Sequence, residues 1–176
     1  MYENVRRTKG PGLYRLRGNL FLTGGILACV AVAVLVIGLV VYAGWYQLRF
    51  RSFLRDLSDS TTFAYENDCL YAEIDDREAL ISGDNVYIIY RLITNAGPGR
   101  LGAVPDEEPD VVLEYGDGSF LQLWSVKLVN SSTDREYGLF LRYVNQQGKS
   151  YAYDTDRISL EHMTARLPAA EPALEK

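Results

Sequence analysis

Carboxylates are the most numerous side chains in this sequence that could carry out chemistry. They gather in three runs, at residues 75–78, at residues 106–110, and at Asp154 with Asp156. Calcium needs six to eight oxygens presented by a loop such as DxDxDG, and none of the three runs has that spacing. A carboxylate pair for glycoside hydrolysis is equally unmarked. We therefore expect these acids to lie in solvated turns.

Histidine and cysteine are too scarce for the common catalytic and metal sites. The chain has one histidine, His162, and two cysteines, Cys29 and Cys69. No motif marks a Ser-His-Asp site, a zinc site lacks its four nitrogen or sulfur ligands, and no glycine-rich phosphate loop is present. We expect no catalytic residues, no metal and no cofactor. An enzyme of unrecognised type that uses carboxylates and tyrosines is the alternative.

Tyrosine is the most unusual component, with 13 copies in 176 residues. Tyrosine suits half-buried strands, which is one explanation for its abundance. The other is a recognition face, because tyrosine offers rigid contact area with a polar tip. The candidate residues for such a face are Tyr87, Tyr90, Tyr143, Tyr151 and Tyr153.

One uncharged stretch, residues 20–46, governs where these side chains are placed. It contains 27 residues, and about 20 apolar residues in a helix cross the ~30 Å hydrocarbon core of a bilayer. The stretch is about twice as long as the apolar region of a cleaved signal peptide. The sequence therefore predicts an uncleaved, single-pass transmembrane helix after a basic tail of residues 1–19.

The flanking charges and the small residues of this stretch suggest its orientation and its neighbours. Five bases precede it and three follow it at residues 49–55, which favours a cytoplasmic N-terminus and an extracytoplasmic domain at the cell membrane. Gly25, Cys29 and Ala33 share one helical stripe, with Gly24 and Ala28 beside it. Small residues allow close helix approach in lipid, so we expect packing on another membrane protein or on a second copy.

The remaining chain is expected to form a small, mainly β domain. Residues 47–60 predict a juxtamembrane amphipathic helix or stalk that ends at Ser58-Asp59-Ser60. Residues 61–167 are expected to form the domain, and residues 168–176 are expected to be a disordered end. About six antiparallel strands, in an open barrel or sandwich, are expected at residues 69–74, 85–94, 110–115, 119–129, 138–144 and 149–154. Residues 85–94 are dense in β-branched and aromatic side chains and predict a central strand. Residues 157–166 fit a short helix or a last strand.

Charge then narrows the classes of function. Residues 56–176 carry 22 acids and 10 bases, a net charge of −12, which disfavours nucleic-acid binding. The acidic surface keeps the domain soluble or meets a basic partner. We expect a membrane-anchored binding or scaffolding module in contact with lipid. Besides the enzyme, the alternative is an accessory subunit that stabilises a larger channel or transporter.

Overall fold

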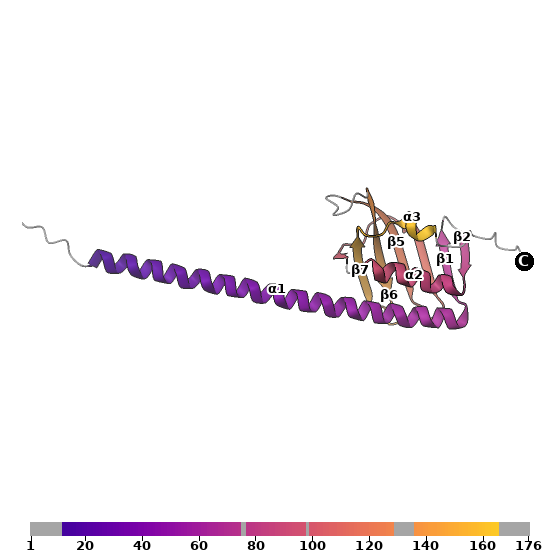
Figure 1. The fold of residues 1–176 in the computed structure, drawn as a ribbon, viewed down its shortest axis with the longest axis horizontal. Coiled ribbons are helices and arrows are strands. Elements are labelled where there is room, and N and C mark those ends of the chain that lie inside the picture. Colours follow the sequence, from indigo (N-terminus) through magenta and orange to yellow (C-terminus); the bar gives the residue numbers. More distant parts are fainter. Residues whose placement is uncertain (1–11, 75–76, 98, 129–135, 166–176) are drawn as a thin grey trace, which may run out of the picture. The chain divides into compact units, whose positions relative to one another are not determined.

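The computed structural model describes residues 12–74, 77–97, 99–128 and 136–165, and the side chains from residue 25 onward. The chain divides into two compact units, Met1–Leu48 and Arg49–Lys176. Helix α1 (Gly12–Asn67) contributes to both units (Figure 1). The expected basic tail lies mostly, and the expected disordered end entirely, outside the described residues.

The first unit is described as the N-terminal part of α1. Every side chain from Gly25 to Trp45 is exposed, and the apolar part of the helix has a mean hydropathy of 3.0. By length and composition this is the one helix in the described part of the chain that could cross a membrane. Within its own unit, no described residue covers these apolar side chains.

The second unit is built on one open antiparallel sheet. Its seven strands lie in the order β2-β1-β4-β5-β6-β7-β3 (Figure 1). The strands are β1 (Leu70–Ile74), β2 (Arg77–Ile81), β3 (Arg100–Leu101), β4 (Val111–Tyr115), β5 (Phe120–Lys127), β6 (Tyr137–Val144) and β7 (Ser150–Thr155). Helices α2 (Asp84–Asn95) and α3 (Leu160–Thr164) complete the unit, and α3 lies against β5.

One face of this sheet forms the core under the last third of α1. Alternate strand residues such as Leu113, Leu121 and Leu141 are buried, as period-two side-chain alternation requires. Phe53 of α1 contacts the rings of Tyr143, Tyr151 and Tyr153 at centroid distances of 5.9, 5.7 and 5.3 Å. Residues 49–67 of α1 therefore pack as part of the same compact unit as the sheet.

The expected end of the helix at residues 58–60 is wrong, because α1 continues to Asn67. Thr61 and Thr62 donate hydrogen bonds from their hydroxyl groups to the carbonyls of Leu57 and Ser58, one turn back. Ser60 and Thr61 are buried against the sheet. Polar residues that resemble a helix terminator are thus an interior, hydrogen-bonded stretch of helix.

The expected central strand at residues 85–94 is also wrong, because this segment is helix α2. Its buried residues are Val86, Ile89 and Ile93, which recur at helical rather than strand spacing. Gly83, at φ +58°, turns the chain just before the helix. Burial of this one stripe outweighs the strand preference of the β-branched and aromatic residues.

The other strand predictions agree with the structure at the level of single elements. The strand expected at residues 69–74 is β1, and the two expected hairpins are β4–β5 and β6–β7. Strands β2 and β3 are additional to the expected ones and residues 85–94 are not a strand, so the described strands number seven rather than about six. The sheet is a single open layer, and neither a barrel nor a second sheet forms in the described part of the chain.

Candidate functional site

The five tyrosines proposed for a recognition face do not share a surface. Tyr143, Tyr151 and Tyr153 are 0–2% exposed beneath α1, so they serve the core. Tyr87 and Tyr90 lie on α2. Tyr87 is 37% exposed, and its ring centroid lies 4.7 Å from that of Tyr65. A tyrosine face built from strand residues is therefore not available to solvent at these positions.

The five small residues expected to pack on a neighbour, Gly24, Gly25, Cys29, Ala28 and Ala33, all lie in the helical N-terminal part of α1. A Cβ placed on Gly25 would meet nothing within 4 Å. Cys29 is a free and exposed thiol. The described chain offers this stripe no neighbour of its own, and whether it packs on another helix stays a prediction.

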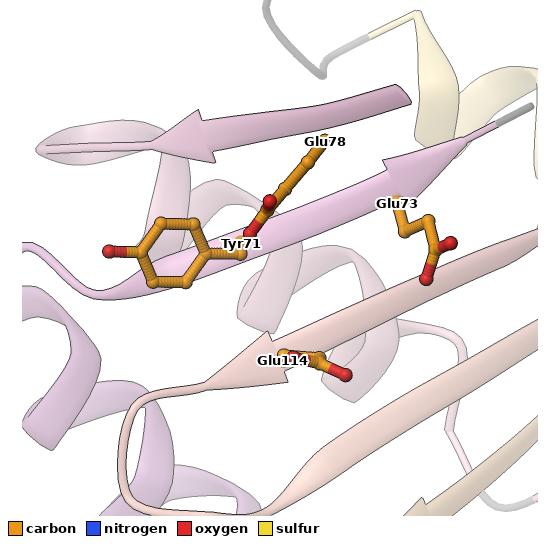
Figure 2. A pocket seen from close by; sticks show the side chains of 4 residues that line it. All are labelled: Tyr71, Glu73, Glu78 and Glu114. Carbon is orange, nitrogen blue, oxygen red and sulfur yellow. The ribbon is translucent and has the colours of Figure 1, made fainter. Parts of the chain in front are cut away.

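The second face of the sheet is open where strands β2, β1 and β4 lie side by side. Alternation sends Tyr71, Glu73, Glu78 and Glu114 to this face, while Leu70, Ala72 and Leu113 point into the core. The four side chains line a shallow hollow of about 300 Å³ (Figure 2). We refer to Tyr71, Glu73, Glu78 and Glu114 as the acidic hollow.

Strand register sets the geometry of the acidic hollow. Glu73 on β1 lies directly opposite Glu78 on β2, and Tyr71 lies directly opposite Glu114 on β4. Two like charges in directly opposed positions destabilise an antiparallel pair, by roughly 0.2–1 kcal/mol. Among the residues that the structure describes, none of the three glutamates forms an ion pair. The hollow is thus an exposed anionic surface in which two like charges occupy directly opposed positions.

The rest of this face is occupied by the protein itself. The loop between β3 and β4 covers Trp124 and Phe140, and the Trp124 indole donates a hydrogen bond to the Glu107 carbonyl at 2.9 Å. Arg142, on the same face, donates to Gln122 and Ser150 at 3.3 Å. The accessible part of the face is therefore the end formed by β2, β1 and β4.

A second polar group of residues joins α1 to the two hairpin turns. The Asp117 carboxylate accepts hydrogen bonds from the Ser60 hydroxyl at 2.6 Å, the Ser119 hydroxyl at 2.6 Å, the Ser119 N–H at 2.8 Å and the Gln146 amide at 2.9 Å. The Tyr143 hydroxyl lies 2.8 Å from the Ser60 hydroxyl. We call Ser60, Asp117, Ser119, Tyr143 and Gln146 the Asp117 clasp.

A second aspartate, Asp56, makes similar contacts from α1, one helical turn before Ser60. Asp56 accepts hydrogen bonds from the hydroxyl of Tyr151 at 2.5 Å and from the side-chain amide of Asn145 at 3.1 Å. Its main-chain carbonyl accepts from the Tyr143 hydroxyl at 3.0 Å. Together the two aspartates attach residues 56–60 of α1 to both hairpins.

The pKa values fit a structural role for the Asp117 clasp. Burial raises the pKa of Asp117, but the hydrogen bonds from Ser119, Ser60 and Gln146 outweigh it and hold the pKa below its ordinary value. Burial raises the pKa of Tyr143, and it raises that of Tyr115 further. An ionised aspartate whose oxygens already accept four hydrogen bonds has little capacity to act as a base.

Neither polar group has the composition of a metal or nucleophile site. In the described part of the chain, no three His, Cys, Asp or Glu residues are placed to hold one metal ion. His162 is exposed on α3, where its main-chain N–H donates a hydrogen bond to the Ser159 hydroxyl, and its imidazole forms no hydrogen bond with a described residue of either group. Ser60 therefore has an aspartate beside it but no imidazole to accept its proton.

Sequence reasoning missed the acidic hollow because only part of its signal is local. Alternation in residues 70–74 places Tyr71 and Glu73 on the polar face, and that signal was available. The presence of Glu114 beside them depends on the pairing of β1 with β4, which no local pattern specifies.

In comparisons with family models, curated proteins and solved structures, nothing matches this chain.

Proposed function

We propose that this chain is a single-pass membrane-anchored protein whose β-rich domain acts as a binding or scaffolding module in a membrane complex. Residues 20–46 would form the anchor, with the N-terminus in the cytoplasm and the domain on the extracytoplasmic side of the cell membrane. The acidic hollow would be the surface that meets a partner.

A single observation carries the proposal. From Gly25 to Trp45 the helix presents only exposed, uncharged side chains, and the described residues of its unit do not cover them. Apolar surface in water costs roughly 25 cal/mol per Å², so an uncovered helix of this length needs lipid or another protein around it. A bilayer meets that need along the whole segment, because the helix also satisfies its own backbone hydrogen bonds.

Membrane insertion and orientation can be tested with one introduced cysteine. In a Cys29→Ser, Cys69→Ser background, Gln147→Cys places a thiol on the exposed turn between β6 and β7. We expect the full-length protein to stay with membranes after alkaline extraction, and a membrane-impermeant maleimide to label this cysteine in intact cells. Release by alkali contradicts the anchor, and labelling only after the membrane is opened contradicts the orientation.

The binding role can be separated from a role of the helix alone. Gly25→Leu, Cys29→Leu and Ala33→Leu together fill the small-residue stripe. Val30→Leu, Val34→Leu and Val41→Leu provide a control with the same number of introduced leucines on another side of the helix, at 100° per residue, although each change adds less volume. A partner that crosslinks to the full chain, and is lost when residues 49–176 are removed, supports a binding module.

A partner that persists without the domain, but is lost with the stripe variant, indicates an accessory subunit instead. If neither change alters the set of crosslinked membrane proteins, the binding role is refuted while the anchor can still stand.

A further inference from the structure

The free edge of strand β2 is the feature that identifies a class of partner. Strand β2 is the terminal strand of the sheet, paired with β1 on one side only. Within the described part of the chain no strand pairs with its other side. In an antiparallel sheet, alternate residues of an edge strand direct N–H and C=O groups outward, where they can bond another extended chain.

The side chains of β2 make this edge accessible. Leu80 is 48% exposed, and Arg77 and Glu78 are exposed. Edge strands are commonly protected by proline, a bulge or a covering element, and β2 contains no proline. Its pairs with β1 run without interruption from Leu70 opposite Ile81 to Ile74 opposite Arg77. A regular five-residue edge of this kind can accept a further extended chain without rearrangement.

Charge decides between the two extended chains that could pair there. A second copy of this protein would bring a domain of the same sign, since residues 49–176 carry a net charge of −9. It would also add a second acidic hollow next to the first. A basic segment instead places a cation beside Glu78, which already faces Glu73 across the β1–β2 pair. That cation relieves the repulsion between the two carboxylates.

We propose that β2 binds an extended, basic segment of a partner protein as an eighth strand of the sheet. The partner residue opposite Glu78 is lysine or arginine, and the residue opposite Leu80 is apolar, because these two positions share a face. The partner is thus recognised by an apolar and a basic residue two positions apart in an extended chain. This proposal rests on the binding role given above and names the surface and the partner chemistry.

The first experiment uses full-length protein in detergent and a fluorescent, end-capped heptapeptide with lysine, valine and lysine at its even positions and threonine at its odd positions, so that valine and lysine lie two positions apart on one face. Fluorescence anisotropy at about 0.1 M salt measures its dissociation constant. We expect saturable binding that weakens about tenfold or more in the Glu73→Gln, Glu78→Gln double variant. The matched control is Glu107→Gln, Glu108→Gln, which removes the same charge from an exposed loop and is expected to change binding less than twofold.

A second peptide tests strand pairing separately from charge. Methylation of alternate backbone nitrogens along the pairing edge leaves every lysine in place but removes the donors for the sheet ladder. We expect this peptide to bind at least tenfold more weakly than the unmodified one. Equal binding of the two peptides, or an equal loss in the loop control, shows attraction by net charge alone and overturns the proposal.

Two further results would also refute it. Absence of saturable peptide binding removes the basic partner outright. Self-association of the protein that is lost in a Leu80→Lys variant, measured by sedimentation in detergent, assigns the edge to a second copy instead. Neither result affects the crosslinking experiment on the full chain, so failure of this inference is distinguishable from failure of the binding role.

Discussion

Replacement of Asp117 gives the most quantitative prediction for stability, because this one carboxylate connects three parts of the fold. Its oxygens accept hydrogen bonds from Ser60 of α1, from Ser119 just before β5, and from Gln146 in the β6–β7 turn. Replacement by alanine leaves the hydroxyls of Ser60 and Ser119, which are 3% and 1% exposed, without their acceptor. We expect the variant to loosen residues 49–67 of α1 from the sheet.

The magnitude follows from the two buried hydroxyls. A hydrogen bond to a charged group contributes about 1.5–3 kcal/mol, and a stranded buried polar group costs about 1–3 kcal/mol. The Gln146 bond is exposed and contributes little. Since Ser60 and Ser119 can still bond each other, over 2.8 Å, part of the loss is recovered. We therefore expect Asp117→Ala to lower the free energy of unfolding by about 2–4 kcal/mol.

Urea unfolding of the full chain in detergent measures this change. The protein has two tryptophans, so a Trp45→Phe background leaves Trp124, which is 4% exposed and contacts Phe140, as the fluorescent reporter. Asp106→Ala serves as the control, since this aspartate is exposed. A double-mutant cycle with Ser60→Ala should give a coupling energy of about 1–2 kcal/mol, because the two groups are in direct contact.

The pH dependence gives an independent check of the same interaction. The folded state holds the pKa of Asp117 below its ordinary value, so the unfolded state binds the proton more tightly. The contribution of Asp117 is therefore present above the unfolded pKa near 4 and is lost as the pH falls through the lower folded value. Asp117→Asn should flatten this acid limb. A loss below 0.5 kcal/mol in Asp117→Ala, with an unchanged acid limb in Asp117→Asn, would refute the role assigned to the clasp.

Three further predictions concern the core and one close backbone contact. Phe53→Ala should lower the free energy of unfolding by about 3–5 kcal/mol in the same assay, since its ring is 1% exposed among three tyrosines, whereas Phe63→Ala, 40% exposed on the same helix, should cost under about 1 kcal/mol. Gly99→Ala should lower the free energy of unfolding by about 1–3 kcal/mol, because its Cβ would lie 1.8 Å from the carbonyl oxygen of Asp154. Gly44→Ala, with open space around it, should lower the free energy of unfolding far less, and equal values for the two variants would contradict this contact. Burial raises the pKa of Tyr115 and Tyr143, so the stability that their neutral forms provide is present below pH 10 and is lost as the pH rises above it. Ultraviolet titration should show these phenols ionising only as the domain unfolds. Tyr143→Phe should weaken the loss of stability at alkaline pH.

Local patterns in the sequence were sufficient for those parts of the fold that local chemistry decides. The β4–β5 turn follows from Gly116-Asp117-Gly118, where Gly118 adopts φ +87°, a conformation that glycine reaches without strain. Strand β1 follows from its alternation, and the apolar part of α1 from its composition. In each case the signal lies within a few residues of the element itself.

The errors arose where distant contacts determine the local structure. Residues 84–95 contain strand-forming side chains, yet burial of Val86, Ile89 and Ile93 makes them a helix. Strand β2 reads REALI, which is rich in helix formers, and pairing with β1 makes it extended. Propensity amounts to tenths of a kilocalorie per residue, so tertiary burial outweighs it at both segments.

The candidate site was partly predictable for the same reason. Tyr151 and Tyr153 stand two residues apart on β7, so the sequence places them on one face of a strand. It does not say that Phe53, about 100 residues earlier in the chain, covers that face. Glu114 reaches Tyr71 only because β4 pairs with β1. The residues that share a surface are therefore set by sheet order, which a single sequence does not give.

The two faces of the sheet lead to a further distinction between fold stability and partner binding. A partner that used the buried face would have to displace Phe53 and expose three tyrosine rings, which costs several kilocalories per mole by the estimate for Phe53→Ala. A partner on β2 displaces none of the residues that the structure describes, since that edge and the acidic hollow are exposed among them. Asp117→Ala should therefore destabilise the domain and leave the affinity of the valine–lysine peptide within about twofold, as long as the domain remains folded. A parallel loss of stability and peptide affinity would place the binding surface under α1 instead.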